Sequence, residues 1–204
     1  MAKIHCGVWI MDKFMWRKRK AFLKEECEDM IEKFEQTPFK DKNAEDIECD
    51  FKYFDNYRQY SCLPSDFSNP DWSDVGVMIV SFIKEYAKEH PFLFEEMAKW
   101  GLYGGFHVQK YEPGHCYQSE HMEHGITNDS EHRMHGWMVY LNDCDGGTYW
   151  PSQNFTSKPR TGDFYIWPAG WTHSHRGISA STIKYILTGW TVMKEQNDAL
   201  QIIQ

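Results

Sequence analysis

The pattern of apolar and polar residues divides the chain into a helical first half and a strand-rich second half. Residues 16–36 place apolar side chains at helical spacing opposite charged ones, which predicts an amphipathic helix ending at Thr37-Pro38. A second helix is predicted over 72–88, where Ser73-Asp74 can cap its start, and a third over 92–100, ending before Gly101. The side chains expected to be buried are Phe22, Leu23, Cys27, Met30, Ile31 and Phe34 in the first helix and Val77, Met78, Val80, Ile83 and Tyr86 in the second.

From Leu102 onward, the chain consists of short runs rich in Tyr, Trp, Ile, Val and Thr. Turn signals such as Glu112-Pro113-Gly114 and Asp145-Gly146-Gly147 separate these runs. Short, regularly spaced strands are typical of an antiparallel double-sheet barrel. The predicted fold class is therefore α+β, with a double-stranded β-helix (jelly-roll) core and the N-terminal helices packed on one face. We expect a single domain over 1–204, with a mostly helical flank over 1–100, the jelly-roll core over 101–195 and a tail over 196–204.

Composition and charge narrow the possible partners. The 204 residues, 41% of them hydrophobic, suffice for one domain with its own core. A net charge of −8 disfavours nucleic acid as a partner, and we interpret the one basic run, Arg17-Lys18-Arg19-Lys20, as a solvated helix face. The chain has no apolar stretch of 18 residues, so neither a membrane segment nor a signal peptide is predicted.

The cysteines are scattered and include no C-x-x-C pair. This spacing suits neither a zinc site nor a dense disulfide framework. We therefore expect free thiols in a reducing compartment, and hence a cytoplasmic protein; the cysteines are Cys6, Cys27, Cys49, Cys62, Cys116 and Cys144.

Histidines are concentrated in the strand-rich half, where eight of the ten lie between positions 107 and 175. His121 and Glu123 are separated by one residue, so on a strand both side chains point to the same side. Two imidazoles and one carboxylate on one face are the ligands of non-haem Fe(II) sites. The second imidazole is that of His173 or His175, which share the same strand parity, and Lys184 follows with a fixed positive charge. The histidines not expected to bind metal are His107, His115, His132 and His135.

The segment from Tyr111 to Trp190 resembles the Fe(II)/2-oxoglutarate-dependent dioxygenases, in particular the prolyl-4-hydroxylase-like branch of bacteria and phages. The resemblance lies in the ordered stretches YEPGHCYQSEHMEH, RMHGWMVYLNDCDGGTYW and KPRTGDFYIWPAGWTHSHRGISASTIKYILTGW, about 80 residues in all. It implies that His121 and Glu123 stand at the H-x-D pair of metal ligands, with glutamate in place of the usual aspartate. It also implies that His175 is the distal ligand, because the basic residue of the family follows that ligand by nine or ten positions, as Lys184 does here.

The same resemblance implies a co-substrate site. Lys184 would pair with the C5 carboxylate of 2-oxoglutarate, Tyr140 would hydrogen-bond that carboxylate, and Tyr111 would lie near the other end of the co-substrate. Trp190 would form a wall of the pocket. The implied cofactors are Fe(II), 2-oxoglutarate and O₂, with ascorbate in support, and no catalytic residue is implied beyond the metal ligands. The implied activity is hydroxylation of a prolyl residue in a protein or peptide, with release of succinate and CO₂.

Two alternatives remain open at the level of sequence. One keeps the chemistry but takes a free amino acid, a nucleobase or another small molecule as substrate. The other is a cupin-like metal-binding module without oxygenase activity, which would have no need of Lys184. Four aromatic residues of the intervening segment could line a substrate cleft, but we expect them to pack beneath the barrel instead; they are Phe54, Tyr57, Tyr60 and Trp72.

Overall fold

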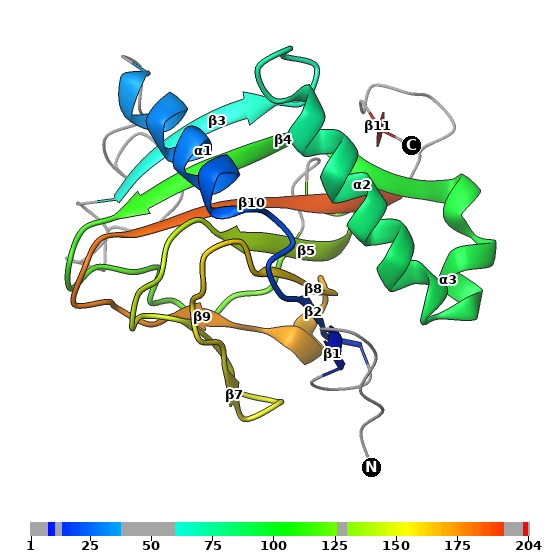
Figure 1. Ribbon diagram of the computed structural model, residues 1–204. Helices are drawn as coiled ribbons and strands as arrows, with labels where there is room; N and C mark the ends of the chain where they lie inside the picture. Colours follow the sequence, from blue (N-terminus) through cyan, green and yellow to red (C-terminus); the bar gives the residue numbers. More distant parts are fainter. Residues whose placement is uncertain (1–7, 11–13, 38–59, 126–129, 194–201, 204) are drawn as a thin grey trace.

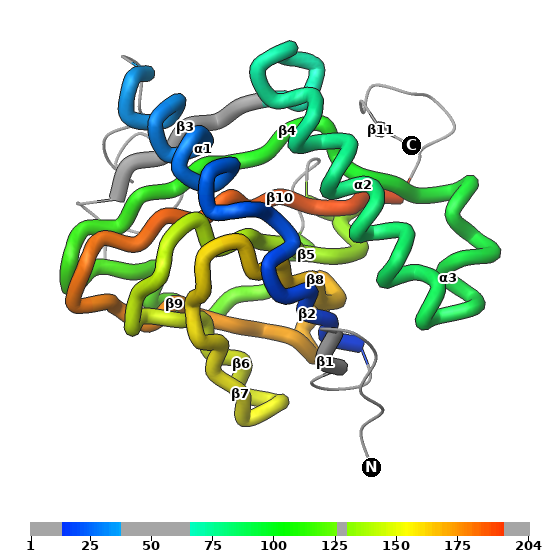
Figure 2. Tube along the Cα trace, in the orientation of Figure 1, coloured from blue at the N-terminus to red at the C-terminus, as the bar shows by residue number. Residues whose placement is uncertain are grey.

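The chain folds into a large antiparallel sheet with helices on one face and a small sheet on the other (Figures 1 and 2). The structure is a computed structural model that describes residues 8–10, 14–37, 60–125, 130–193 and 202–203. Within these residues the large sheet has the order β1-β2-β8-β5-β10-β4-β11, with β3 also paired to β4, and the small sheet has the order β7-β6-β9. This double-sheet arrangement is the predicted jelly roll.

The strands of the large sheet come from both halves of the chain. They are β1 (Val8–Ile10), β2 (Trp16–Lys18), β3 (Tyr60–Asp66), β4 (Trp100–Tyr111), β5 (Arg133–Tyr140), β8 (Phe164–Pro168), β10 (Lys184–Met193) and β11 (Ile202–Ile203). The small sheet comprises β6 (Thr148–Trp150), β7 (Phe155–Thr156) and β9 (Arg176–Gly177).

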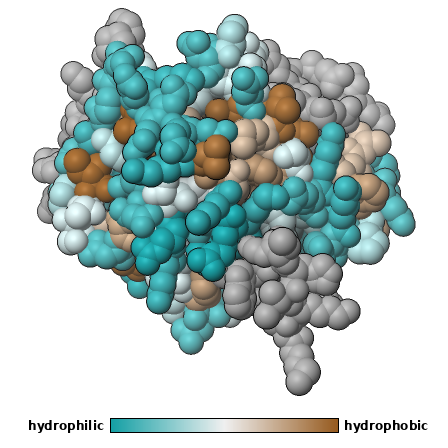
Figure 3. All heavy atoms as spheres, viewed as in Figure 1, coloured by the Kyte–Doolittle hydropathy of each residue, from teal (hydrophilic) through white to brown (hydrophobic). Residues whose placement is uncertain are grey.

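The helical elements lie mostly in the first half of the chain. They are α1 (Lys24–Gln36), α2 (Ser73–Lys88), α3 (Pro91–Glu95) and the 3₁₀ turns η2 (Met97–Lys99) and η3 (Trp171–His173). The face that carries α1 and α2 presents mainly hydrophilic side chains (Figure 3). None of the described helices combines the length and the apolarity needed to cross a lipid bilayer.

Both faces of the large sheet are buried, because alternate residues of its strands enter two different cores. On β8, Phe164 and Ile166 pack against the helices, whereas Tyr165 and Trp167 face the small sheet. On β5, Val139 in the same way belongs to the helix-side core. The core between the two sheets contains Met15, Met138, Tyr140, Trp150, Tyr165 and Trp167. It borders the candidate site described below.

The second predicted helix is confirmed, since α2 spans Ser73–Lys88. Its buried side includes Val80, Ile83 and Tyr86, as expected, but Val77 is 65% exposed. Trp72 packs in the core, with its ring 5.1 Å from that of Phe106, which agrees with the packing interpretation. The other three aromatic residues of that segment have side chains outside the described residues.

The first predicted helix was placed too early, since α1 begins at Lys24 and residues 16–18 form strand β2. Strand β2 pairs with β8, and the Arg17 Nε donates to Asp163 Oδ2 at 3.0 Å. The Lys18 Nζ donates to Glu85 Oε1 at 2.7 Å. The basic run is therefore not a helix face, because pairing with a distant strand outweighs the local helical propensity. Leu23, expected to be buried, precedes α1 and is 64% exposed.

The third predicted helix was too long. It is replaced by the short α3 and η2, and strand β4 already begins at Trp100. The flank expected to be mostly helical also supplies β1, β2 and β3 to the large sheet. Strands β2 and β3 are stabilised by pairing with β8 and β4, which lie far along the chain and which local periodicity does not reveal.

Candidate metal centre

His121, Glu123 and His175 converge beside the core between the two sheets, where the His175 ring contacts Trp150 and Trp167. Their candidate ligand atoms all lie within 4.8 Å of one another. We expected His121 and Glu123 on a regular strand, but they lie in an irregular segment where His121 forms an isolated antiparallel bridge with His175. The bridge consists of His121 N–H to His175 O at 2.9 Å and His175 N–H to His121 O at 2.8 Å. Backbone pairing, rather than a full strand, brings the two imidazoles together.

Both imidazoles of the triad are held in one tautomer. The Nδ1 of His121 lies 2.9 Å from the carbonyl oxygen of Ser119, and the Nδ1 of His175 lies 3.1 Å from that of His173. A carbonyl oxygen can only accept, so each Nδ1 carries a proton and each Nε2 is the ring atom left to face the other candidate ligands. Burial, and then the neighbouring His175, lower the pKa of His121 to about 4, which keeps this imidazole neutral at pH 7. Neutral imidazoles with free Nε2 atoms are the form that binds a metal.

The carboxylate of Glu123 is buried but supported by hydrogen bonds. The indole Nε1 of Trp190 donates to Glu123 Oε2 at 2.6 Å, and an Nη1 of Arg133 donates to the backbone carbonyl of Glu123 at 3.3 Å. The guanidinium of Arg133 lies over the Trp190 ring, 3.6 Å from its centroid. Burial alone would raise the pKa of Glu123, but its contacts with His175, His121 and Trp190 lower it to about 2, so the group is ionised.

The geometry of the triad calls for a shared cation. Glu123 Oε1 lies 3.2 Å from the Nε2 of His175, whose Nδ1 proton is already donated to a carbonyl. Two lone pairs at this distance repel each other unless a proton or a metal ion lies between them. Two imidazole nitrogens and one carboxylate on one side also leave the opposite positions open to other ligands. The residues present therefore fit a divalent metal.

Glycine at position 136 makes room for the longer glutamate. A Cβ at Gly136 would lie 2.8 Å from Glu123 Cγ and 2.9 Å from two ring atoms of Trp167, closer than side chains tolerate. Gly136 pairs with Trp190 across β5 and β10, so it also lies opposite the residue that donates to the carboxylate. Sequence reasoning missed Arg133 and Gly136, and it considered Trp190 only as a pocket wall. Only the pairing of the strands relates these three residues to Glu123.

His173 does not belong to the triad. Its backbone carbonyl orients His175, while its own Nδ1 lies 3.0 Å from the Thr172 hydroxyl. The structure thus brings His175, rather than His173, next to His121 and Glu123. Of the histidines not expected to bind metal, His135 contacts the Thr191 hydroxyl at 2.7 Å and His107 lies against Trp190.

Lys184 is a buried cation at the start of β10. Its side chain lies on the same face of the strand as that of Trp190, since the two residues are six positions apart and strand residues alternate between the faces. Lys184 is only 3% exposed, and its Nζ donates to the Ile178 carbonyl at 3.2 Å and lies 4.9 Å from the centroid of the Tyr111 ring. No carboxylate of the described residues lies within ion-pair distance of it. Burial lowers the pKa of Lys184, and an anion at this point would relieve that cost.

The two predicted co-substrate tyrosines are both buried. Tyr111 pairs directly with Lys184 across β4 and β10, and its hydroxyl donates to Gln109 Oε1 at 2.9 Å. The Tyr140 hydroxyl lies 2.6 Å from Ser157 Oγ and 3.1 Å from Thr148 Oγ1, in the core between the sheets. Burial raises the pKa of Tyr140, so its hydroxyl stays protonated at neutral pH and can act as a donor.

Comparison with known proteins identifies the fold. No protein-family model matches the sequence, and no curated protein matches it. Among solved structures, the viral collagen prolyl hydroxylase of Paramecium bursaria Chlorella virus-1, in complex with 2OG, is 16% identical with a TM-score of 0.63, over 89% of this chain and 97% of that chain.

Two further prolyl hydroxylases have the same fold. The Pseudomonas putida prolyl-4-hydroxylase is 14% identical with a TM-score of 0.63, over 91% of this chain and 96% of that one. A Trichoplax adhaerens prolyl hydroxylase, in complex with a peptide fragment of the hypoxia inducible factor oxygen degradation domain, is 12% identical with a TM-score of 0.67, over 90% and 86%. The chain thus has the fold of prolyl hydroxylases, which confirms the predicted jelly-roll α+β class.

Proposed function

We propose that the protein is an Fe(II)- and 2-oxoglutarate-dependent hydroxylase that acts on a prolyl residue of a protein or peptide. The observation that carries the proposal is the combination of the His121, Glu123 and His175 triad with Lys184, a buried cation without a carboxylate partner among the described residues. A metal-binding module without oxygenase activity would need only the first of these. The shared fold with a prolyl hydroxylase in complex with 2OG supports the same conclusion.

In this proposal the triad holds the metal. The Nε2 atoms of His121 and His175 and the carboxylate of Glu123 are the ligands, and the Nδ1 hydrogen bonds keep both rings in the binding tautomer. Trp190 fixes the carboxylate through the bond to Oε2. When bound, Fe(II) together with 2-oxoglutarate and O₂ supplies the oxidising chemistry that yields succinate, CO₂ and a hydroxylated product.

Lys184 and the two tyrosines would hold the co-substrate. The Lys184 ammonium pairs with the C5 carboxylate, and the Tyr140 hydroxyl donates to the same carboxylate while Ser157 and Thr148 fix its direction. Tyr111 packs beside the lysine, so we place it at the C5 end of the co-substrate rather than at the other end, which the resemblance implied. The aromatic core around these groups excludes water, which strengthens the ion pair.

The surroundings of the triad favour a polymeric substrate over a small molecule. Met122, between two of the ligands, is 44% exposed, and Trp171, four residues before His175, is 77% exposed. Exposed apolar side chains beside a buried centre provide a surface on which an extended peptide can lie. A prolyl hydroxylase of the same fold has been solved with a peptide bound.

The test of the proposal compares Lys184→Met with Lys158→Met, which removes an exposed lysine. We expect Lys184→Met to raise the KM for 2-oxoglutarate at least tenfold. A tenfold change corresponds to about 1.4 kcal/mol, which is the minimum expected for the loss of a charge-assisted hydrogen bond. Fe(II) affinity should stay unchanged, and Lys158→Met should behave like the wild type. Equal KM values for the three proteins would contradict the assigned role of Lys184.

Substrate class is tested separately, by mass spectrometry on a panel of proline-rich peptides. The proposal predicts the added mass of one oxygen atom on a prolyl residue, dependent on Fe(II) and 2-oxoglutarate. Succinate formation without any modified peptide, together with stimulation by a free amino acid or a nucleobase, would instead favour the small-molecule alternative.

A further inference from the structure

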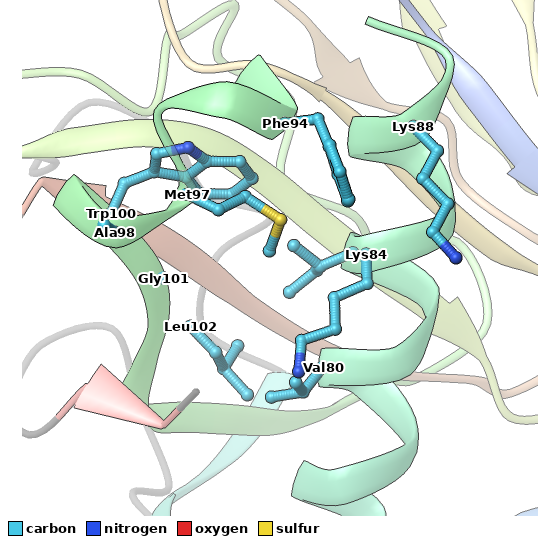
Figure 4. A pocket seen from close by; sticks show the side chains of 10 residues that line it. Val80, Lys84, Lys88, Phe94, Met97, Ala98, Trp100, Gly101 and Leu102 are labelled. Carbon is cyan, nitrogen blue, oxygen red and sulfur yellow. The ribbon is translucent and has the colours of Figure 1, made fainter. Parts of the chain in front are cut away.

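A cavity separate from the metal centre lies between α2, α3, η2 and the first residues of β4 (Figure 4). Its volume is about 540 Å³, within the range of small-molecule sites. It lies on the helix side of the large sheet, because Leu102 belongs to the helix-side core whereas the next residue, Tyr103, contacts Trp190. The apolar side chains that line it are Val80, Ile83, Phe94, Met97, Trp100 and Leu102.

The interior of this cavity offers little to a polar ligand. The indole Nε1 of Trp100 already donates to the Leu93 carbonyl at 3.1 Å. None of the side-chain nitrogen or oxygen atoms that are buried without a partner in the described residues belongs to the lining. A ligand that carried amides or hydroxyls along its length would therefore lose their hydrogen bonds to water without replacement. The body of the ligand should be apolar.

The rim, in contrast, carries two positive charges. Lys84 and Lys88 lie one turn apart on α2 and both belong to the lining of the cavity. The Lys84 side chain extends along the cavity toward Val80, whereas that of Lys88 extends outward from the rim (Figure 4). Neither has an ion pair or hydrogen bond within the part of the chain that the structure describes, whereas Lys18 and Lys99 nearby are paired with Glu85 and Glu96. Two unpaired ammonium groups beside an apolar cavity complement a ligand with one anionic end.

We propose that this cavity binds a medium-chain fatty acid, with the acyl chain between α2 and β4 and the carboxylate at Lys84 and Lys88. Phe94, which is 47% exposed, would cover the chain and lose contact with water on binding. The apolar interior and the cationic rim thereby recognise different parts of one amphiphile.

The experiment titrates the full-length protein with decanoate below its micelle-forming concentration, by calorimetry and by methyl NMR. We expect one saturable site, with shifts at Ile83, Met97 and Leu102. In the series hexanoate, octanoate, decanoate, each added methylene should tighten the Kd by up to about fourfold. Decyltrimethylammonium has an alkyl chain one methylene longer than that of decanoate and the opposite charge, and it should bind at least tenfold more weakly.

Two sets of variants test the two halves of the site. The double variant Lys84→Gln and Lys88→Gln should weaken decanoate binding about fivefold or more, whereas Lys24→Gln with Lys158→Gln, the same loss of charge away from the cavity, should not. Ala98→Phe, which places a ring at an exposed lining position, should weaken decanoate and octanoate alike.

The proposal would be overturned by binding without saturation, by shifts confined to other regions, or by equal affinity for decanoate and decyltrimethylammonium. Equal weakening by the two double-lysine variants would also overturn it, because the effect would then reflect only the net charge. Unchanged thermal unfolding shows that the Ala98→Phe protein is correctly folded. If this folded variant binds decanoate as tightly as the wild type, the cavity is not the binding site.

Discussion

The indole of Trp190 should matter to the metal centre through a single hydrogen bond, and Trp190→Phe removes that bond while keeping an aromatic ring. The Nε1 donates to Glu123 Oε2 at 2.6 Å, and the acceptor is a buried, ionised carboxylate. A hydrogen bond to a charged group contributes about 1.5–3 kcal/mol. That range corresponds to roughly ten- to hundredfold in metal affinity, the effect usual for groups that orient a metal ligand.

A matched control is available, because the same substitution at another buried tryptophan removes no hydrogen bond. Trp16 is buried, and its Nε1 has no hydrogen-bond partner among the described residues. Trp16→Phe therefore removes the same atoms but no hydrogen bond. The assay is anaerobic calorimetry of Fe(II) binding to both variants and the wild type, with chemical unfolding to compare their stabilities.

We expect the Fe(II) Kd of Trp190→Phe to rise tenfold or more and that of Trp16→Phe to change less than threefold. If both variants bind Fe(II) like the wild type, Trp190 does not orient the ligand. If both lose affinity equally, the effect comes from general destabilisation, and the reasoning from the Glu123 hydrogen bond is refuted.

Three further predictions concern packing, pH and thiol reactivity. Gly136→Ala should weaken Fe(II) binding, measured by calorimetry, and lower the free energy of unfolding by about 1–3 kcal/mol, measured by chemical denaturation, because the added Cβ would meet Glu123 Cγ. Gly170→Ala is the control and should change neither quantity, because its Cβ would meet nothing within 4 Å. Burial, and then His90 and His173, lower the pKa of His135 to about 3. Since an unfolded histidine has a pKa near 6.5, the unfolded state binds more protons between these values. Stability should then fall as the pH drops through that window, by at most about 1.4 kcal/mol per unit, and urea unfolding of His135→Gln should show a flatter pH dependence. Burial, and then Glu26, raise the pKa of the Cys27 thiol to about 12, so the thiol stays protonated and unreactive in the folded protein. Mass spectrometry should therefore detect alkylation of Cys27 only after unfolding, and rapid alkylation of Cys27 in the folded protein would contradict this prediction.

The parts of the fold that local periodicity encodes were predictable from sequence. Helix α2 carries a continuous 3.6-residue stripe, and the strands after Leu102 have the short lengths and turns of a jelly roll. Strand β2 was not predictable, because its residues form a good helical pattern and become a strand only by pairing with β8 and Asp163. Such pairings over long sequence separations leave no local signal.

The candidate site likewise contains residues that could be predicted from the sequence and residues that could not. The spacing of His121 and Glu123, and of His175 and Lys184, could be read along the chain, and the structure brings the three candidate ligands together. The groups that support them come from separate strands: Gly136 from β5 and Trp190 from β10. Their relation to Glu123 depends on strand register, which the sequence alone does not specify.

The central claim is that the triad and Lys184 form one oxidising centre, and turnover of the co-substrate tests it most directly. Purified protein supplied with Fe(II), ascorbate, O₂ and 2-oxoglutarate should form succinate, weakly without substrate. His175→Ala and Glu123→Ala should abolish this activity, while Lys84→Gln, at the separate cavity, should retain it. Absence of succinate from the wild type, together with no change in the absorption of the iron on addition of 2-oxoglutarate, would contradict the claim.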